Sequence, residues 1–250
     1  MLARISVPAA LVLLAAACGR TPATPHKLSI AAAAYLQFAL AEASRQFQAT
    51  HPAIELQVDY GSSGNFYSQI RNGAPFELFL SADIQYPRLL AKDGIARADS
   101  LFTYAVGRLV VWVPAASHLD PATALRDPSV QRIAIANPQH APYGRAAQAA
   151  LEHMGLTQAV EKKLVLGENI SQTMQFVQSG AADVGIVALA LALAPAVRDQ
   201  GRYWEVPLDA YPKVEQGGAI LKDSPAAREF GAWLLAPEGR RILQQYGFSQ

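Results

Sequence analysis

The chain has 250 residues, of which 51% are hydrophobic and 16% charged, and this composition excludes an intrinsically disordered protein. Its 21 lysines and arginines nearly balance its 20 acidic residues, so no basic surplus exists for a nucleic-acid backbone and no nucleic-acid partner is expected. The single cysteine, Cys18, excludes an internal disulfide and a cysteine-based zinc cluster. The length fits one large domain or two lobes of about 100–150 residues each, and two lobes are favoured.

The N-terminus has the pattern of a secretory signal over residues 1–18. Arg4 precedes an apolar run over 5–14, and three alanines come directly before Cys18. The run is shorter than the roughly 20 residues of a membrane span, so a retained anchor helix is the weaker alternative. Cleavage before Cys18 resembles a bacterial lipobox, although Ala15 stands where leucine is commonest. We therefore expect a periplasmic or otherwise extracytoplasmic protein and leave lipidation of Cys18 open.

The first part of the mature chain alternates between strands and helices. Short apolar or alternating runs predict strands, and helical spacing of apolar residues after each run predicts helices. The expected strands are 27–33, 54–60 and 76–80, and the expected helices are 36–47, 65–71 and 83–90. Such alternation predicts a parallel sheet with helices on both faces, and ligands then collect at the carboxyl ends of the strands.

A second set of elements follows and then returns to the first. Strands are predicted at 108–113, 132–136, 164–166 and 183–187, helices at 121–126, 143–154, 170–178 and 189–197, returning strands at 204–206 and 218–221, and closing helices at 224–235 and 238–246. The chain is expected to cross between lobes near 104–110 and 201–206. The prediction is therefore an α/β protein with lobe I at 27–106 and 206–250 and lobe II at 107–205.

Tight polar turns at three predicted helix starts are the candidate binding sites of this sequence. A helix N-terminus leaves up to four N–H groups unpaired and carries about half a positive charge, so it receives anions without lysine or arginine. The turns are Gly61–Gly64, His140–Gly144 and Gly167–Ser171. Ser63 combines a backbone N–H with a hydroxyl donor beside a glycine. The alternative is that Ser62 or Ser63 is an ordinary helix cap.

Several segments resemble the periplasmic molybdate- and tungstate-binding proteins of ABC importers, which have the type II periplasmic binding protein fold. The resemblance covers nearly all of the mature chain. It rests on IAAAAYLQFAL (30–40), YGSSGNFYSQIRNGAPFELFLSAD (60–83), ANPQHAPYG (136–144), GENI (167–170), DVGIV (183–187) and YGF (246–248). It implies two lobes, each with a mixed, mostly parallel sheet flanked by helices, and a ligand in the cleft between them.

The resemblance implies ligand contacts at Ala34, Tyr35, Ser63, Tyr143 and the N–H of Ile170. Two positions depart from the family pattern. Many members have a small polar residue where this chain has Ala34 and Tyr35, and many have a tyrosine where it has Ala188. Tyr143 would restore one phenol, and Tyr35 would supply another or merely pack. Backbone N–H groups are present whatever the side chain, so a binding site built from them does not depend on either missing side-chain donor.

The implied function is capture of molybdate or tungstate and its delivery to an ABC transporter permease, without catalysis and without a cofactor, by a monomer. Molybdate is fully deprotonated near neutral pH and only accepts hydrogen bonds, so a cage made only of donors suits it. An acidic acceptor would favour hydrogen phosphate, and Asp83 is the nearest candidate, interpreted here as a helix cap. Arg145 is interpreted as a solvated helix residue.

Other interpretations remain open at this point. The same architecture could bind sulfate, phosphate, chromate or another small solute, or serve as a ligand-free interaction protein. A hydrolase built on Ser63, His140 and Asp83 lacks the Gly-x-Ser-x-Gly elbow. The five histidines show no paired metal-ligand spacing, so no direct metal-ion ligands are expected and the metal enters only as its oxyanion.

Overall fold

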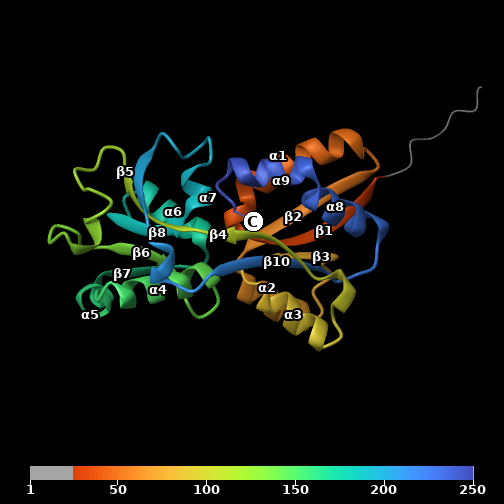
Figure 1. Cartoon of the computed structure of the whole chain (residues 1–250), viewed down its shortest axis with the longest axis horizontal. Coiled ribbons are helices and arrows are strands. Elements are labelled where there is room, and N and C mark those ends of the chain that lie inside the picture. The colour runs from red at the N-terminus through yellow and green to blue at the C-terminus, as the bar shows by residue number, and fades with distance from the viewer. Residues whose placement is uncertain (1–24, 250) are drawn as a thin grey trace, which may run out of the picture.

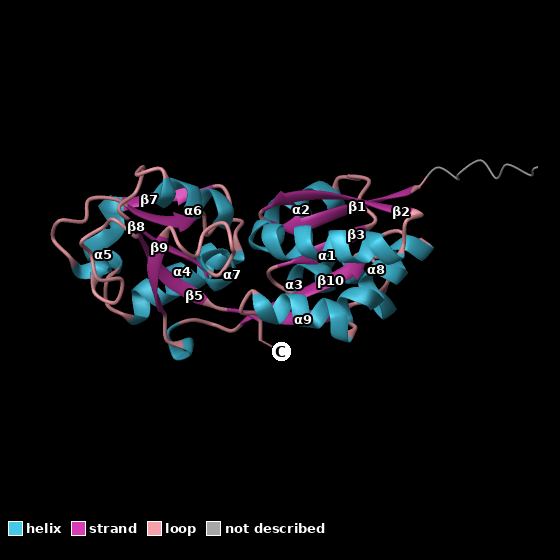
Figure 2. Cartoon of the chain, turned by 90° about the horizontal axis from the view of Figure 1, so that it is seen from above, coloured by secondary structure: helices cyan, strands magenta, loops and turns pink. Residues whose placement is uncertain are grey.

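The computed structural model describes residues 25–249, and the expected signal sequence with Cys18 lies outside the described residues. Within these residues the strands form two five-stranded sheets, placed at opposite ends of the long axis of the molecule (Figure 1). Helices cover both sheets, and the two lobes are joined by extended segments near the middle of the molecule (Figure 2). The expected two-lobed α/β fold is confirmed.

The first sheet has the strand order β2-β1-β3-β10-β4. Its strands are β1 (His26–Ala33), β2 (Ile54–Gly61), β3 (Leu78–Ser81), β4 (Phe102–Gly107) and β10 (Val214–Ile220). β1 pairs in parallel with β2 and β3, whereas β10 runs antiparallel to β3 and β4. Parallel neighbours end at the same edge, so the starts of the segments after β1 and β2 lie together.

The second sheet has the order β7-β6-β8-β5-β9 and the same division of pairings. Its strands are β5 (Leu109–Pro114), β6 (Ile133–Ala136), β7 (Leu164–Gly167), β8 (Val184–Ala188) and β9 (Gly201–Glu205). β6 pairs in parallel with β7 and β8, and β5 is antiparallel to β8 and β9. The chain passes between the sheets at Arg108, between β4 and β5, and again between β9 and β10.

Nine α-helices occur in the described part of the chain. They are α1 (Gln37–Thr50), α2 (Ser63–Arg71), α3 (Gln85–Lys92), α4 (Pro142–His153), α5 (Thr157–Val160), α6 (Ile170–Gln178), α7 (Leu189–Ala192), α8 (Pro225–Leu235) and α9 (Pro237–Gln245). On the first sheet, α1, α8 and α9 cover one face and α2 and α3 the other (Figure 1). A 3-10 turn, η1 (Ala34–Leu36), joins β1 to α1.

Two elements differ from the sequence prediction for local reasons. The helix expected over 189–197 ends at Ala192, because a proline at position 195 lacks an N–H and its ring clashes with the carbonyl four residues earlier. Helix α2 begins at Ser63 rather than Asn65, because the side chain of Ser62 accepts a hydrogen bond from the Asn65 N–H and caps the helix there.

The core of the first lobe is closed by an aromatic cluster between α1 and α8. Phe47 is fully buried, and its ring centroid lies 5.1 Å from that of Phe230 and 5.6 Å from that of Trp233, in edge-to-face arrangements. The apolar face of α1 (Ala39, Leu40, Ala43 and Phe47) follows helical spacing and is buried throughout. This packing holds η1 and the end of β1 in place beneath the cleft.

We expect Phe47→Ala to lower the free energy of unfolding by about 3–5 kcal/mol, because a fully buried ring is lost and a cavity remains. Urea denaturation followed by circular dichroism measures this. Leu89→Ala is the control, since Leu89 is 40% exposed on α3 and its loss should change stability by no more than about 0.5 kcal/mol. Equal effects of the two variants would contradict the assignment of the core.

Candidate functional site

A small cavity of about 10 Å³ lies between the two lobes. This is far below the range of about 300–1,000 Å³ typical of sites for drug-sized ligands, so the closed cavity excludes ligands of that size. The described residues that line it carry no charged side chain. They are Ala33, Ala34, Tyr35, Gly61, Ser62, Ser63, Ala82, Ala141, Pro142, Tyr143, Asn169 and Ile170, which include the five predicted ligand residues.

Four helical starts meet at the cavity, two from each lobe. η1 follows β1 and α2 follows β2 in the first lobe, while α4 follows β6 and α6 follows β7 in the second. In the parallel pairs, Ala33 lies opposite Gly61 and Ala136 opposite Gly167, so each pair of starts is brought to one edge. The first-turn N–H groups of a helix have no partners within the helix and carry a partial positive charge.

The cap of α6 leaves one of these N–H groups for a ligand. Asn169 Oδ1 accepts hydrogen bonds from the N–H groups of Ser171 and Gln172, both at 3.0 Å. Its backbone oxygen accepts from Thr173 at 3.1 Å. The N–H of Ile170, the first residue of the helix, takes no part in this cap and lies at the cavity. The residue predicted to contact the ligand through its N–H is therefore placed to do so.

At the start of α2, too, some N–H groups have partners within the protein and one is left for a ligand. The Asn65 N–H donates to Ser62 Oγ at 3.3 Å, and the Gly64 N–H donates across the cleft to the backbone oxygen of His140 at 2.9 Å. The N–H of Ser63 remains. Ser63 Oγ accepts from the Ala82 N–H at 2.9 Å, so the hydroxyl hydrogen of this fully buried residue is not used by that bond. Ser63 thus offers two donors from one residue.

Tyr143 occupies the second position of α4, after Pro142, which has no N–H. The N–H groups of Gly144 and Arg145 both donate to the oxygen of Ala141, which leaves the N–H of Tyr143 for the cavity. The phenol oxygen of Tyr143 accepts from Gln216 Nε2 at 2.8 Å, and this bond does not use the phenolic hydrogen.

The phenol of Tyr35 is committed elsewhere. Its oxygen lies 2.6 Å from the phenol oxygen of Tyr104, which itself donates to the backbone oxygen of Ser81 at 2.8 Å. Because the single hydrogen of Tyr104 is used on Ser81, Tyr35 must be the donor to Tyr104. Of the two roles predicted for the Tyr35 side chain, packing is the one the structure supports, with its ring 5.1 Å from that of Tyr143. The contribution left for Tyr35 is its backbone N–H.

The lobes are in contact across the cavity, so this is a closed form. Besides the Gly64 bond, Ser171 Oγ donates to the oxygen of Ala34 at 2.9 Å. Arg145 donates to Asp83 at 2.8 Å and to the phenol of Tyr86 at 3.1 Å. The Asp83 carboxylate also accepts from the Gln85 N–H, but Asp83 is not the helix cap that was predicted, because Ile84 occupies the cap position of α3. Arg145, expected to be solvated, instead forms an ion pair between the lobes.

The residues considered for a hydrolase do not form a nucleophile–base arrangement. Ser63 Oγ is bound to the Ala82 N–H, whereas His140 Nδ1 contacts Ser62 Oγ at 2.9 Å and Asp83 pairs with Arg145. Ala188 is buried at the end of β8 opposite Leu109 and does not line the cavity.

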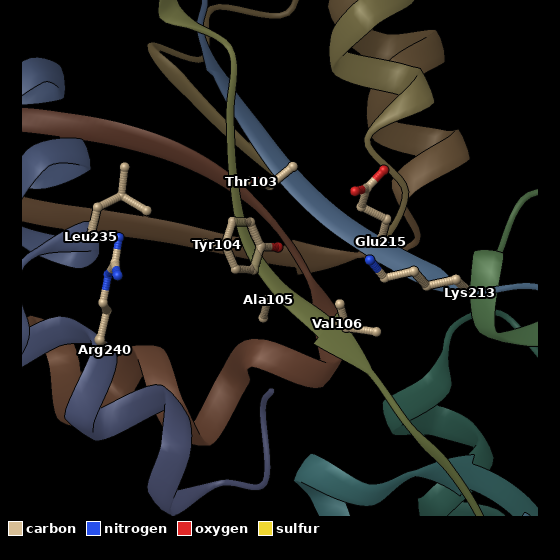
Figure 3. A pocket seen from close by; sticks show the side chains of 8 residues that line it. All are labelled: Thr103, Tyr104, Ala105, Val106, Lys213, Glu215, Leu235 and Arg240. Carbon is tan, nitrogen blue, oxygen red and sulfur yellow. The ribbon is translucent and has the colours of Figure 1, made fainter. Parts of the chain in front are cut away.

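A larger cavity of about 200 Å³ lies beside the crossover strands (Figure 3). It is formed by β4, β10 and the α8–α9 pair of the first lobe alone, and Glu215 stands next to Lys213 at one side of it. Its charged lining residues, Lys213, Glu215 and Arg240, distinguish it from the cavity between the lobes, whose described lining is uncharged. Its described lining residues are Thr103, Tyr104, Ala105, Val106, Lys213, Glu215, Leu235 and Arg240.

Comparison with known proteins agrees with this geometry. Residues 28–249 match the family model of the bacterial extracellular solute-binding proteins. The chain belongs to this family. It is 43% identical over 193 residues to the molybdate-binding protein ModA of Azotobacter vinelandii, covering 76% of this chain and 77% of that protein. It is 39% identical to ModA of Rhodobacter capsulatus, covering 76% and 75% of the two chains.

The solved structure of the Azotobacter vinelandii periplasmic molybdate-binding protein has a TM-score of 0.83 with this chain, at 33% identity, and the match covers 89% and 99% of the two chains. The resemblance inferred from the sequence is thereby confirmed. The extracytoplasmic location expected from the N-terminus agrees with this solute-binding family. Among residues 25–249, no helix combines the length and apolar character needed to cross a bilayer.

Three residues around the site were missed in the sequence. Asn169 caps α6, and the preference of helix caps for asparagine could have revealed it. Gln216 is fully buried in β10 and donates to Tyr143, and its only signal is a polar residue beside two glycines in a strand. Tyr104 holds the phenol of Tyr35, a contact between residues 69 positions apart that no local pattern encodes.

Gly64→Ala should hold the lobes apart. A Cβ at this position would lie 2.6 Å from the His140 oxygen and 2.9 Å from its Cα, and opening the cleft is the way to relieve that contact. Small-angle scattering should give a larger radius of gyration for this variant than for the parent chain. Gly231→Ala in α8 is the control, since its Cβ would meet only ordinary contact at 3.9 Å. An unchanged radius in Gly64→Ala would contradict the closed contact.

Stability should fall in alkali through the buried tyrosines. Burial raises the pKa of Tyr35, Tyr104 and Tyr143 above the usual value near 10. A folded-state pKa above the unfolded one gives stability that is complete below about pH 10 and is lost as the pH rises further. We expect the urea midpoint to fall above pH 10, and less steeply in Tyr104→Phe than in Tyr203→Phe, because Tyr203 is 39% exposed. Parallel curves for the two variants would contradict this account.

Proposed function

We propose that this protein captures molybdate or tungstate outside the cytoplasm and delivers it to the membrane permease of an ABC importer. The observation that carries the proposal is the convergence of first-turn N–H groups from both lobes on a cavity without charged lining residues. Its relatives of 43% and 39% identity are named molybdate-binding proteins, which supports the same ligand here.

The chemistry of the donors favours a fully deprotonated oxyanion. Ser63 offers an N–H and a hydroxyl hydrogen, and Tyr143 and Ile170 offer N–H groups from the facing lobe. A dianion that only accepts hydrogen bonds matches such donors. Hydrogen phosphate carries a proton that needs an acceptor, but no carboxylate is among the described lining residues, and Asp83 is held by Arg145 and the Gln85 N–H. Sulfate and chromate are the competitors that this argument leaves.

Closure of the two lobes around the ligand produces a conformation that the permease can recognise. The bonds from Gly64 to His140 and from Ser171 to Ala34 form only when the lobes meet around the cavity. Binding that draws donors from both lobes therefore favours the closed form over the open one. The anion is transferred and not chemically changed. Lipidation of Cys18 would keep the receptor beside its permease.

We expect Ser63→Ala to weaken molybdate binding by about 1.5–3 kcal/mol, because a hydrogen bond to a charged ligand is lost. Isothermal titration calorimetry with sodium molybdate, followed by tungstate, sulfate and phosphate, measures both affinity and selectivity. Ser68→Ala is the matched control, since Ser68 lies exposed on the same helix. Unchanged affinity in Ser63→Ala would remove this residue from the site, and no binding of any oxyanion to the parent chain would overturn the proposed function.

A further inference from the structure

Ser62 is a polar side chain at the cavity that contacts a histidine of the other lobe. It lines the cavity and is 4% exposed. Its Oγ accepts from the Asn65 N–H at 3.3 Å and lies 2.9 Å from Nδ1 of His140, which comes from the other lobe. A hydroxyl has one hydrogen to donate, so the state of His140 decides where that hydrogen goes.

Glu168 lies on the far side of the imidazole from Ser62. His140 Nε2 lies 3.6 Å from Glu168 Oε2, too far for a hydrogen bond, but the negative charge of this carboxylate favours a hydrogen on Nε2 over a lone pair there. In the neutral ring Nδ1 then has a lone pair and accepts the Ser62 hydroxyl hydrogen. In the protonated ring Nδ1 also carries a hydrogen and donates to Ser62 Oγ. Protonation therefore reverses the direction of this bond.

The reversal releases a donor at the cavity. With His140 protonated, Ser62 Oγ accepts from both the ring and the Asn65 N–H, and its own hydrogen needs a new acceptor. An anion in the cavity that Ser62 lines supplies one. We propose that Ser62 is a conditional ligand donor and that protonation of His140 switches it toward the bound oxyanion, so that affinity rises as the pH falls. This inference rests on the proposed function.

Among the described groups near His140, Glu168 is the charged group that pairs with its ring. From α2 the ring and backbone meet Ser62 and the Gly64 N–H, which are uncharged. From the β3–α3 segment come Asp83 and Tyr86, and both are bound to Arg145 of α4. From the β7–α6 turn comes Glu168, which also accepts from the Asn65 side chain. The side chain of His140 is 18% exposed and that of Glu168 55%, so protons reach the pair from solvent.

The test is the dissociation constant of molybdate, measured by calorimetry between pH 6 and 8.5, a range in which the ligand stays deprotonated and histidine ordinarily titrates. We expect affinity to increase roughly tenfold as the pH falls through this range in the parent chain, because one charge-assisted hydrogen bond is gained. Ser62→Ala and Ser62→Gly should bind at all pH values as the parent does at pH 8.5. Glycine is the second variant because it preserves the helix cap to within a few tenths of a kcal/mol.

Two further variants separate this switch from a structural role. His140→Gln removes the titratable ring, so its affinity for molybdate should stay constant across this pH range. His153→Gln, an exposed histidine at the end of α4, should keep the parent curve. A flat curve in the parent chain, or the same pH dependence in both Ser62 variants, would overturn the inference while leaving the proposed function intact. Absence of molybdate binding at every pH would overturn both.

Discussion

Unpaired N–H groups at the starts of helices are the interaction on which the rest of this structure depends. η1 and α2 bring them from one lobe, and α4 and α6 bring them from the other. The strands before these helices form parallel pairs, β1 with β2 and β6 with β7. Parallel strands end at the same edge of a sheet, so the N–H groups that follow them lie close together. A charged side chain attracts an anion of almost any shape. Fixed N–H dipoles stabilise only an ion whose oxygen atoms lie at hydrogen-bonding positions.

Closure of the lobes uses the same groups as ligand capture. At the start of α2, one N–H goes to the side chain of Ser62, one crosses to His140, and that of Ser63 is left at the cavity. The close approach of His140 requires that position 64 has no Cβ. Ion pairing between Arg145 and Asp83 lies outside the cavity lining, so it favours the closed form without placing charge on the ligand.

The sequence predicts the fold well, and the helix starts that meet at the cavity are also encoded locally. The predicted range of α6 agrees with the structure to the residue, and the turns before α2, α4 and α6 are recognisable from serine, glycine and proline near the helix starts. The early end of α7 was missed because apolar spacing outweighed the proline at position 195.

The side-chain part was harder to predict, since it depends on contacts between distant segments. Whether the phenol of Tyr35 faces the ligand is decided by Tyr104, and the phenol of Tyr143 is met by Gln216 from the crossover strand β10. Arg145 is likewise engaged by Asp83, 62 positions away. None of these pairs leaves a periodic or motif signature in either segment.

Anomalous diffraction at the molybdenum absorption edge, from crystals grown with sodium molybdate, tests the central claim most directly. The account predicts a single strong peak between the lobes, with oxygen atoms within hydrogen-bond distance of the N–H groups of Ser63, Tyr143 and Ile170 and with no lysine or arginine in contact. A peak beside cationic side chains, with the cavity between the lobes left without metal, would contradict it.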